Sequence, residues 1–441
     1  MKVRGITDVA QRVRGGMLSP VDLVKACLAR IDARPQTNAF ITVMRAHALE
    51  QAEHAAREIQ AGRCLGPLHG IPIAVKDLVD VAGTPTTSGS RVPPRNPVVD
   101  ALVIRRLKAA GAIIIGKTNL HEFAFGTTSD ETAFGPVRHP QDPSLSAGGS
   151  SGGSAAALAE EMCFGAVGTD TGGSVRIPAA ACGVVGLKPG FGEISCDGVV
   201  PLSTSLDHVG PLARSVCDAG LLYQAMKGST VQEIAPAGGR LILGVPRPYF
   251  CDRLEGAVRS TLDLVVQRLQ EAGHGVHDLH VEGAQHTPHV YLHIVLPEAS
   301  WYHASTLETH AGDYSPGVRL RLEMGRYVLA EDYVRASRMR ERLTHAVDAA
   351  LERCDALLLP TLPIPPPPVG ATTVDLDGEQ APVRAVMLSL TQLFNLSGHP
   401  AIALPAGRGP EGIPRSIQLV GHRGRTERLL DIAEAVQGLI A

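Results

Sequence analysis

Two glycine- and serine-rich segments in the middle of the chain carry hydroxyl groups that could act as nucleophiles. They span residues 148–154 and 168–178, and their serines Ser150 and Ser174 stand 24 residues apart. One helix and one short strand are expected between them, so both serines could lie in loops at one edge of a sheet. Glycine leaves room in such loops and permits unusual backbone angles, so other groups can approach closely. Taken singly, each segment is more typical of a structural or anion-binding turn.

A lysine elsewhere in the chain could supply the base that a serine nucleophile needs. Lys76 follows the apolar run 71–75, at the point where a predicted strand ends. In a partly buried pocket lined by serine hydroxyls the charged amine is disfavoured, so its pKa falls and it can accept a proton. The alternative interpretations of Lys76 are a surface charge and a partner of Asp77. The successive amides of residues 171–174 could point one way and bind an oxyanion.

Helices followed by short apolar strands recur along the chain and must position these residues. This alternation predicts the α/β class, with a single large α/β/α layered domain whose central sheet is mixed, mostly parallel, and flanked by helices. Strands at 401–404 and 416–420 and a closing helix continue the pattern near the end. The helix–strand pairs are expected at 101–110 and 112–115, at 155–162 and 164–168, at 178–183 and 184–187, and at 213–227 and 241–245.

No internal repeat and no long linker divides the chain, which predicts one domain over residues 1–441. Within it we expect N-terminal helices at 1–65, a core with the chemical motifs at 66–230, a helical covering region without strands at 250–350, and a C-terminal part of the core at 355–441.

Composition excludes several classes of protein. The chain has 41 Lys and Arg against 44 Asp and Glu, a net charge of −3, which argues against a protein that wraps nucleic acid. No segment approaches the ~20 uninterrupted apolar residues that cross a bilayer, and residues 1–8 lack the apolar core of a signal peptide. We therefore expect a cytoplasmic protein without a membrane or nucleic-acid partner. Eight cysteines without a C-x-x-C pair predict reduced thiols.

Three further motifs suggest other chemistry, and the local sequence argues against each. Residues 111–118 match the phosphate-binding pattern G-x-x-x-x-G-K-[ST], but the intervening residues Ala-Ile-Ile-Ile predict a strand instead of a loop. Residues 148–153 match the nucleophile-elbow pattern G-x-S-x-G, but no apolar strand precedes them. Six histidines crowd residues 274–293 without a recognised zinc pattern, so neither a metal nor a cofactor is expected.

Taken together, the motifs resemble the amidase signature family. The resemblance rests on residues 70–77, Gly-Ile-Pro-Ile-Ala-Val-Lys-Asp, followed in order by segments 148–154 and 168–178. It covers nearly the whole chain, with further similarity at 116–123, 186–189, 205–211 and 395–405.

The resemblance implies a Ser–cis-Ser–Lys triad. Ser174 matches the nucleophile, Ser150 the bridging serine and Lys76 the base, and the cis peptide would join Gly149 to Ser150. The implied oxyanion hole consists of the amides of Thr171, Gly172, Gly173 and Ser174. Supporting roles are implied for Thr169, as a hydrogen-bond partner of the lysine, for Asp170 and Arg176, as an ion pair that braces the loop, and for Ser151 and Ser154, as loop and helix-cap residues.

The implied activity is hydrolysis of the C–N bond of a small or medium carboxamide through a seryl acyl-enzyme, which releases ammonia or an amine. Specificity would be set by the covering region and by residues 123–127, 301–303 and 327–333. One alternative is the amidase subunit of a glutamine-dependent tRNA amidotransferase, although its tyrosine-rich segment is missing near 327–336. The other is a non-catalytic module that binds an anion or ligand. The sequence leaves the oligomeric state open, a homodimer included.

Overall fold

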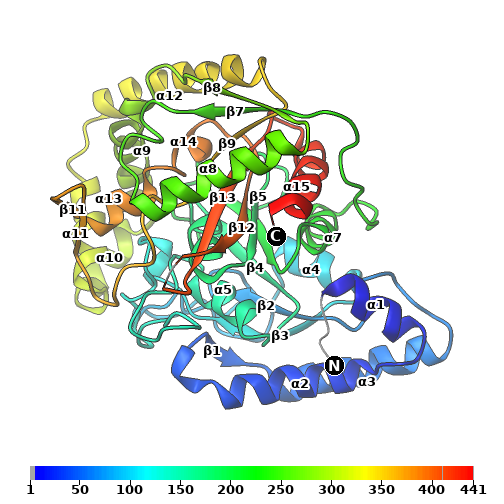
Figure 1. Cartoon of the computed structure of the whole chain (residues 1–441). Helices are drawn as coiled ribbons and strands as arrows, with labels where there is room; N and C mark the ends of the chain where they lie inside the picture. The colour runs from blue at the N-terminus through cyan, green and yellow to red at the C-terminus, as the bar shows by residue number, and fades with distance from the viewer. Residues whose placement is uncertain (1–4, 410, 441) are drawn as a thin grey trace.

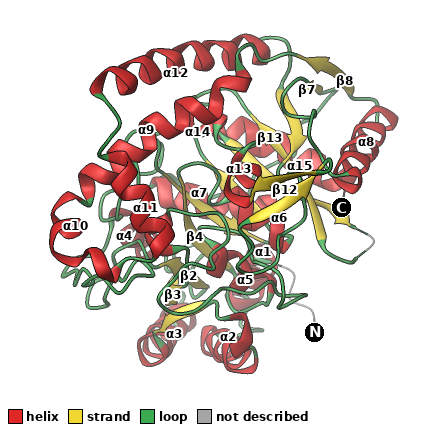
Figure 2. Ribbon diagram, turned by 90° about the vertical axis from the view of Figure 1, so that its left-hand side faces the viewer, coloured by secondary structure: helices red, strands yellow, loops and turns green. Residues whose placement is uncertain are grey.

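The computed structural model describes residues 5–409 and 411–440. Residues 1–4, which belong to the segment expected to lack the apolar core of a signal peptide, lie outside the described residues. Within this part of the chain, helices pack around one 11-stranded sheet (Figures 1 and 2). Its strands, in order across the sheet, are β1 (Phe40–Val43), β3 (Ile113–Thr118), β2 (Pro72–Lys76), β4 (Gly165–Asp170), β6 (His208–Ala213), β5 (Val185–Lys188), β12 (Ala401–Arg408), β13 (Pro414–Val420), β9 (Ala356–Pro360), β7 (Ile242–Pro246) and β8 (Gly275–Leu279). A separate hairpin pairs β10 (Thr373–Leu376) with β11 (Glu379–Pro382).

Local sequence explains where helices begin. Ser19 accepts a hydrogen bond from the Val21 amide at 3.2 Å and Pro20 opens the helix that follows, which is a typical N-terminus. The helices are α1 (Ile6–Arg14), α2 (Pro20–Ala33), α3 (Arg45–Gln60), α4 (Leu102–Ala109), α5 (Gly152–Ala159), α6 (Arg176–Cys182), α7 (Val216–Lys227), α8 (Gly256–Glu271), α9 (Thr287–Tyr302), α10 (Ala304–His310), α11 (Pro316–Gly325), α12 (Ala330–Leu351), α13 (Val383–Leu388), α14 (Leu393–Leu396) and α15 (Thr426–Ile440). No helix in the described ranges is both long and apolar enough to cross a membrane.

The predicted layered α/β fold with a mixed central sheet is confirmed, and the pairings show where parallel strands occur. β2 runs parallel to β3 and β4, and β7 runs parallel to β8 and β9. The pairs between these two groups, from β4 to β9, are antiparallel. The parallel pairs therefore lie toward the two sides of the sheet, and antiparallel pairs such as β12–β13 form its centre. Strands β12 and β13 are joined by a short connection, which can link only antiparallel neighbours.

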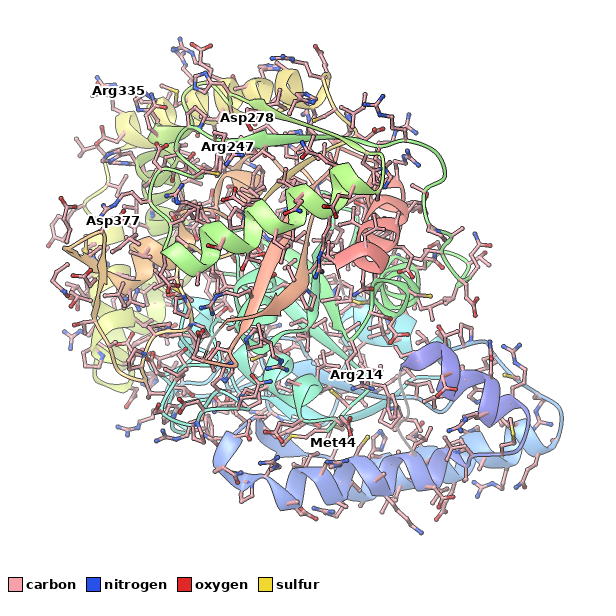
Figure 3. The ribbon with its side chains drawn as sticks, viewed as in Figure 1. Met44, Arg214, Arg247, Asp278, Arg335 and Asp377 are labelled. Carbon is pink, nitrogen blue, oxygen red and sulfur yellow. The ribbon has the colours of Figure 1, made fainter. Side chains whose placement is uncertain are left out.

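The covering region differs from its prediction in one respect. The expectation that residues 250–350 contain no strand is wrong, because β8 lies there and extends the sheet beside β7. Arg247 and Asp278, which lie close together in Figure 3, form an ion pair of 2.9 Å across these strands. The sequence did not indicate β8 because its residues are partly polar. An edge strand with partly exposed side chains lacks the apolar run that marks a buried strand. The helices α9–α12 gather on one side of the molecule (Figure 2).

The order of the strands brings the chemical residues to one edge of the sheet. β2 and β4 are parallel neighbours, with Val75 paired to Val167. Because parallel strands end at the same edge, Lys76 at the end of β2 lies beside the end of β4 and the loop that carries Ser174.

The lysine of the phosphate-binding pattern is held in the sheet. Lys117 lies in the fully buried strand β3, as the apolar sequence around it predicted. Its Nζ atom is 2.7 Å from Asp77 Oδ1, and both side chains have no exposed surface. Lys117 also donates to Thr86 Oγ1 at 3.1 Å, and Thr87 donates to Asp77 from its backbone amide at 3.0 Å. Lys117 is therefore a structural cation with a buried partner.

We predict that Asp77→Ala destabilises the fold, because it leaves the Lys117 ammonium buried without a counter-charge. The free energy of unfolding, measured by urea titration, should fall by about 3–5 kcal/mol. Glu427→Ala, which removes the exposed ion pair with Lys227, is the control and should cost at most about 1 kcal/mol. Equal effects of the two variants would contradict this account.

Candidate active site

The side chain of Lys76 is completely buried and reaches the loop before α5 and the end of strand β4. Its Nζ atom donates to Ser150 Oγ at 2.7 Å and to Thr169 Oγ1 at 2.8 Å. The hydrogen bond predicted for Thr169 is therefore present. In the described part of the chain the amine donates to these two hydroxyls and to no carboxylate.

Burial decides the charge of this amine. It lowers the pKa of Lys76 to about 7, although the negative charges of Asp170 and Asp207 act in the opposite direction. An amine with this pKa is largely neutral just above pH 7 and can then accept a proton from a hydroxyl group.

The peptide bond between Gly149 and Ser150 is cis, as predicted. Tight packing surrounds this bond: a Cβ atom at Gly149 would lie 2.8 Å from the backbone nitrogen of Thr128, so only glycine fits. The hydroxyl of the next residue, Ser129, donates to the Ser150 carbonyl oxygen at 3.1 Å. Residues 128 and 129 thus hold the loop that presents Ser150 to the lysine.

The loop that carries Ser174 lies directly against the Ser150 loop. The amide of Ser151 donates to the Ser174 carbonyl oxygen at 3.2 Å. The Ser174 side chain is buried, and within the described ranges its hydroxyl makes no direct hydrogen bond to Ser150 Oγ. The structure therefore brings the two serine segments together and links Lys76 to Ser150, and the last hydroxyl pair is not joined by a hydrogen bond.

The amides before and after the nucleophile position are used differently. Val175 and Arg176 donate their amides to Asp170 Oδ2 at 3.1 and 3.4 Å. The amides of residues 171–174 donate to no acceptor among the described residues. Because buried amides normally have a partner, these free donors suit an anionic oxygen supplied by a substrate.

The ion pair predicted between Asp170 and Arg176 is present. Arg176 Nη2 lies 3.0 Å from Asp170 Oδ1, its Nε lies 3.0 Å from Oδ2, and both side chains have no exposed surface. Burial alone would raise the pKa of Asp170, but Arg176 outweighs it and holds the pKa well below its usual range. Arg176 also donates to Asn395 Oδ1 at 2.7 Å and to the Thr391 carbonyl at 3.0 Å. This pair ties the Ser174 loop to the C-terminal part of the core.

Comparison with known proteins identifies the family. Residues 22–430 match the family model described as Amidase. The chain belongs to the amidase family.

Relatives of this amidase include both free enzymes and a component of a larger enzyme. An amidase from Pseudomonas putida is 38% identical over 92% of this chain and 90% of its own length. A glutamyl-tRNA(Gln) amidotransferase subunit from Desulfatibacillum aliphaticivorans is 34% identical over 98% of this chain and 96% of its own length. An amidase crystal structure superposes with a TM-score of 0.94 at 37% identity, covering 99% of this chain and 100% of that chain. The protein is accordingly an enzyme that hydrolyses amide carbon–nitrogen bonds.

One buried acidic residue beside the candidate site, Asp207, was not among the residues that the sequence predicted for it. Asp207 Oδ1 accepts a hydrogen bond from Thr171 Oγ1 at 2.5 Å, and its Oδ2 accepts from the amides of Leu202 and Ser203. Burial raises the pKa of Asp207 to about 6, against these hydrogen bonds. Asp207 lies in the segment 205–211 that resembles the family, and this was the available signal.

Residues from the second half of the chain pack against Gly172, and their local sequence gave no signal of this. A Cβ atom at Gly172 would lie 2.5 Å from the phenolic oxygen of Tyr291 and 3.0 Å from Leu388 Cδ2. Thr391 Oγ1 donates to the Gly172 carbonyl at 2.6 Å. Helices α9 and α13 thus close the space above this loop.

The loops predicted to set specificity divide into two groups. Phe123 is buried and its ring lies 4.4 Å from that of His303, so two of these segments do meet. Trp301 and Tyr327, in contrast, have 75% and 84% of their surface exposed. Side chains this exposed point to solvent, so Trp301 and Tyr327 are removed from the candidates that contact a substrate in the buried site.

The two other serines of the first loop are not helix caps. Ser151 occupies the N-cap position of α5, but its side chain caps no helix amide. Its hydroxyl donates to the Thr169 carbonyl at 3.2 Å and accepts from the Thr169 amide at 3.3 Å. Ser154 lies inside α5 and donates to the Val167 carbonyl at 3.2 Å. Both serines therefore bind the helix to β4, because glycine and alanine neighbours let α5 approach the strand closely.

The histidine-rich segment makes ordinary polar contacts. His274 Nδ1 accepts from the Leu241 amide at 3.1 Å, and His293 Nδ1 lies 2.7 Å from the His289 carbonyl. In the ranges that the structure describes, no group of three or more His, Cys, Asp or Glu is placed to hold a metal ion.

We predict that Gly173→Ala disrupts the loop of the free amides. Gly173 has φ +144°, and an added Cβ would meet Thr391 Oγ1 and lie 2.7 Å from Ile177 Cδ1. Amide hydrolysis should fall roughly 100-fold because the loop shifts, and the free energy of unfolding should fall by about 1–3 kcal/mol. Gly438→Ala, in open space on α15, should keep activity and add up to about 1 kcal/mol. Unchanged kinetics in Gly173→Ala would contradict the assignment.

Proposed function

We propose that this amidase is a free-standing hydrolase of a small or medium carboxamide that acts through an acyl-enzyme on Ser174. The observation that carries the proposal is the hydrogen bond of 2.7 Å from the buried Lys76 amine to Ser150 Oγ. The pKa of about 7 lets this amine act as a base near neutral pH. A module that only binds an anion would have no use for a buried base beside a serine hydroxyl, which argues against that alternative.

The first step forms the acyl-enzyme. Neutral Lys76 takes the proton of Ser150, Ser150 takes the proton of Ser174, and the Ser174 oxygen attacks the amide carbonyl carbon. The developing oxyanion accepts hydrogen bonds from the amides of residues 171–174, each worth ~3 kcal/mol at the transition state. The proton then returns along the same chain to the leaving nitrogen, because an amide anion is too poor a leaving group to depart alone.

The second step releases the acid. Water attacks the ester carbonyl of the acylated Ser174 and gives its proton to Ser150, and Lys76 accepts the proton of Ser150. The oxyanion again lies against the amides of residues 171–174. Collapse of the intermediate breaks the bond to Ser174, whose oxygen regains its proton through Ser150.

A component of a tRNA amidotransferase is the second candidate. It is favoured by the similarity to the Desulfatibacillum aliphaticivorans protein, which extends along nearly the whole of both chains. The segment 327–336, which contains Tyr327 and Tyr333 but no tyrosine-rich stretch, favours the free-standing enzyme. Ammonia release from glutamine that increases when a partner protein is added would support the second candidate. The cytoplasmic location stays a prediction of the sequence, which leaves the oligomeric state open.

We predict that a fluorophosphonate probe forms a covalent bond with Ser174. Peptide mass mapping should find the label on the peptide that contains Ser174, and Ser174→Ala should abolish both labelling and amide hydrolysis. Ser154→Ala is the control, because that hydroxyl binds β4 and lies within the helix. A folded wild-type protein that resists the probe would remove the acyl-enzyme from the mechanism.

We predict that kcat/KM rises with pH and levels off above an inflection near 7, since only the neutral Lys76 amine accepts a proton. Asp207→Asn should move this inflection to lower pH, because the negative charge of Asp207 favours the charged amine and raises its pKa. Asp197→Asn, at an exposed site, is the control and should leave the profile unchanged. An inflection in Asp207→Asn that stays or moves upward would contradict the assigned base.

A further inference from the structure

A partly buried cation without a hydrogen-bond partner lines a cavity beside the segment that packs on Gly149. Arg384, on α13, donates no hydrogen bond to any described residue, and its Nε atom is buried and unpaired. The cavity has a volume of about 450 Å³ and is lined by Thr127, Thr128, Arg321 and Arg384 among others. An N–H group withdrawn from water without an acceptor is costly, so the Nε atom of Arg384 favours a ligand that accepts a hydrogen bond.

A second arginine lies beside the first without neutralising it. The guanidinium carbons of Arg321 and Arg384 lie 5.4 and 5.6 Å from the centre of the Phe125 ring. Burial lowers the pKa of Arg384, the phenol of Tyr291 opposes this, and the charge of Arg321 lowers the pKa further. No carboxylate is among the groups that act on it. One aromatic ring therefore adjoins two guanidinium groups.

The two carboxylates that line the cavity have other partners. Glu131 accepts from Arg321 Nη2 at 3.0 Å, and its hydrogen bond with His121 is the main reason why its pKa falls to about 2. Asp130 Oδ1 accepts from the Thr128 hydroxyl, and Asp130 Oδ2 accepts from the Gly370 amide at 3.0 Å. Arg384 is thus left without a counter-charge of its own.

The cavity adjoins the catalytic loops on two sides. Arg384 and Leu388 are four residues apart on α13 and so share one face of the helix, and Leu388 is the residue that packs on Gly172. On the opposite wall, Thr128 belongs to the segment that packs on Gly149. A molecule bound in the cavity would therefore lie between the helix that packs on Gly172 and the segment that packs on Gly149.

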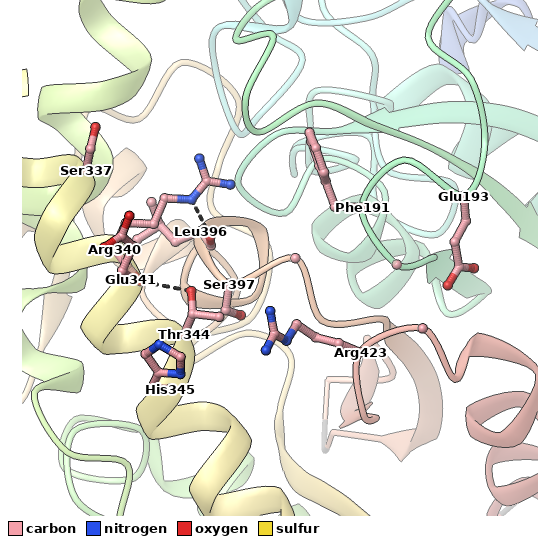
Figure 4. A pocket seen from close by; sticks show the side chains of 13 residues that line it. Phe191, Glu193, Ser337, Arg340, Glu341, Thr344, His345, Leu396, Ser397 and Arg423 are labelled. Atoms are coloured by element: carbon pink, nitrogen blue, oxygen red, sulfur yellow. Dashed lines mark hydrogen bonds between the residues drawn. The ribbon is translucent and has the colours of Figure 1, made fainter.

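Another cavity of this protein is lined by arginines whose guanidinium groups have hydrogen-bond or ion-pair partners. It has a volume of about 610 Å³ and lies between α12 and the segments around Phe191 and Ser397 (Figure 4). There Arg340 donates to the carbonyls of Leu396 and Ser205 at 2.6 and 2.9 Å, and Arg423 pairs with Asp348 at 2.6 Å. Arg384 makes none of the corresponding contacts.

We propose that Arg384 binds a carboxylate of the substrate, so that the enzyme acts on amides that carry a negative charge. This inference rests on the proposed amide hydrolysis at Ser174 and adds the class of its substrate. A planar guanidinium can hold a carboxylate through two parallel hydrogen bonds, and Arg321 adds a second positive charge nearby. The carboxylate offsets the unpaired charge and fixes one end of the substrate relative to Ser174.

The test compares pairs of amides that differ in charge. The pairs are succinamate with butyramide, glutaramate with valeramide, and N-acetyl-β-alanine with N-propylacetamide, so that the carboxylate is placed on either side of the amide. We predict that the wild-type enzyme prefers the charged member of at least one pair by at least about 10-fold in kcat/KM. Arg384→Gln should lower kcat/KM of that member by about 10- to 100-fold and leave the neutral member unchanged.

Two variants serve as controls for this prediction. Arg319→Gln removes an exposed arginine of α11 that pairs with Glu323, and it should change neither member of a pair. Arg384→Lys keeps the positive charge but loses the planar set of N–H donors, so it should retain part of the preference for the charged amide. Succinate or glutarate should also protect Ser174 from the fluorophosphonate probe in the wild type and less so in Arg384→Gln, which measures binding without turnover.

The failures of the two proposals are distinguishable. If the wild type prefers the neutral members while the probe labels Ser174, the charge preference is wrong and the acyl-enzyme mechanism stands. If Arg384→Gln slows both members equally, Arg384 supports the fold and the inference is overturned. If no amide is cleaved and the probe labels Ser174, absence of protection by either dicarboxylate overturns the inference. If the folded protein neither cleaves an amide nor reacts with the probe, the proposed function fails, and the inference fails with it.

Discussion

The removal of one lysine amine from water is the constraint on which the rest of the structure depends. The Lys76 amine is fully buried and has two hydroxyl oxygens as acceptors, at 2.7 and 2.8 Å. Hydrogen bonds to two neutral acceptors do not compensate for the lost hydration of the charged amine, so the neutral form of Lys76 becomes accessible near pH 7. A carboxylate in contact with the amine would keep it charged, and the fold must therefore keep the nearby acids engaged elsewhere.

The acidic residues around the amine satisfy this requirement in different ways. Asp170 follows Thr169 directly in the chain, and Arg176 binds both of its oxygens. Asp207 accepts hydrogen bonds from Thr171 and from two backbone amides, so it also makes no contact with the lysine. Their remaining field raises the pKa of Lys76 against burial and keeps it near neutrality, where a base is most useful.

The two halves of the chain contribute different parts of the candidate site. The triad candidates and the free amides come from β2, β4 and the loops next to α5 and α6, all within residues 70–180. The residues that close the space above them come from α9 and α13. Because α13 presents both Leu388 to Gly172 and Arg384 to the adjoining cavity, one short helix connects the reacting loop with the charge that we propose as the binding group.

The sequence by itself determined the candidate reaction centre, which stays a proposal, and most of the core elements of this protein. The motifs around Lys76, Ser150 and Ser174 are continuous in sequence, and apolar runs such as 112–115 mark their strands locally. Only the tertiary structure decided the antiparallel centre of the sheet, the edge strand β8, and the places of Tyr291 and Arg384 beside the candidate site. The physical reason is that these features depend on contacts between segments a hundred or more residues apart. Such contacts leave no periodicity in the chain, because a side chain buried by a distant helix has the same local sequence as an exposed one.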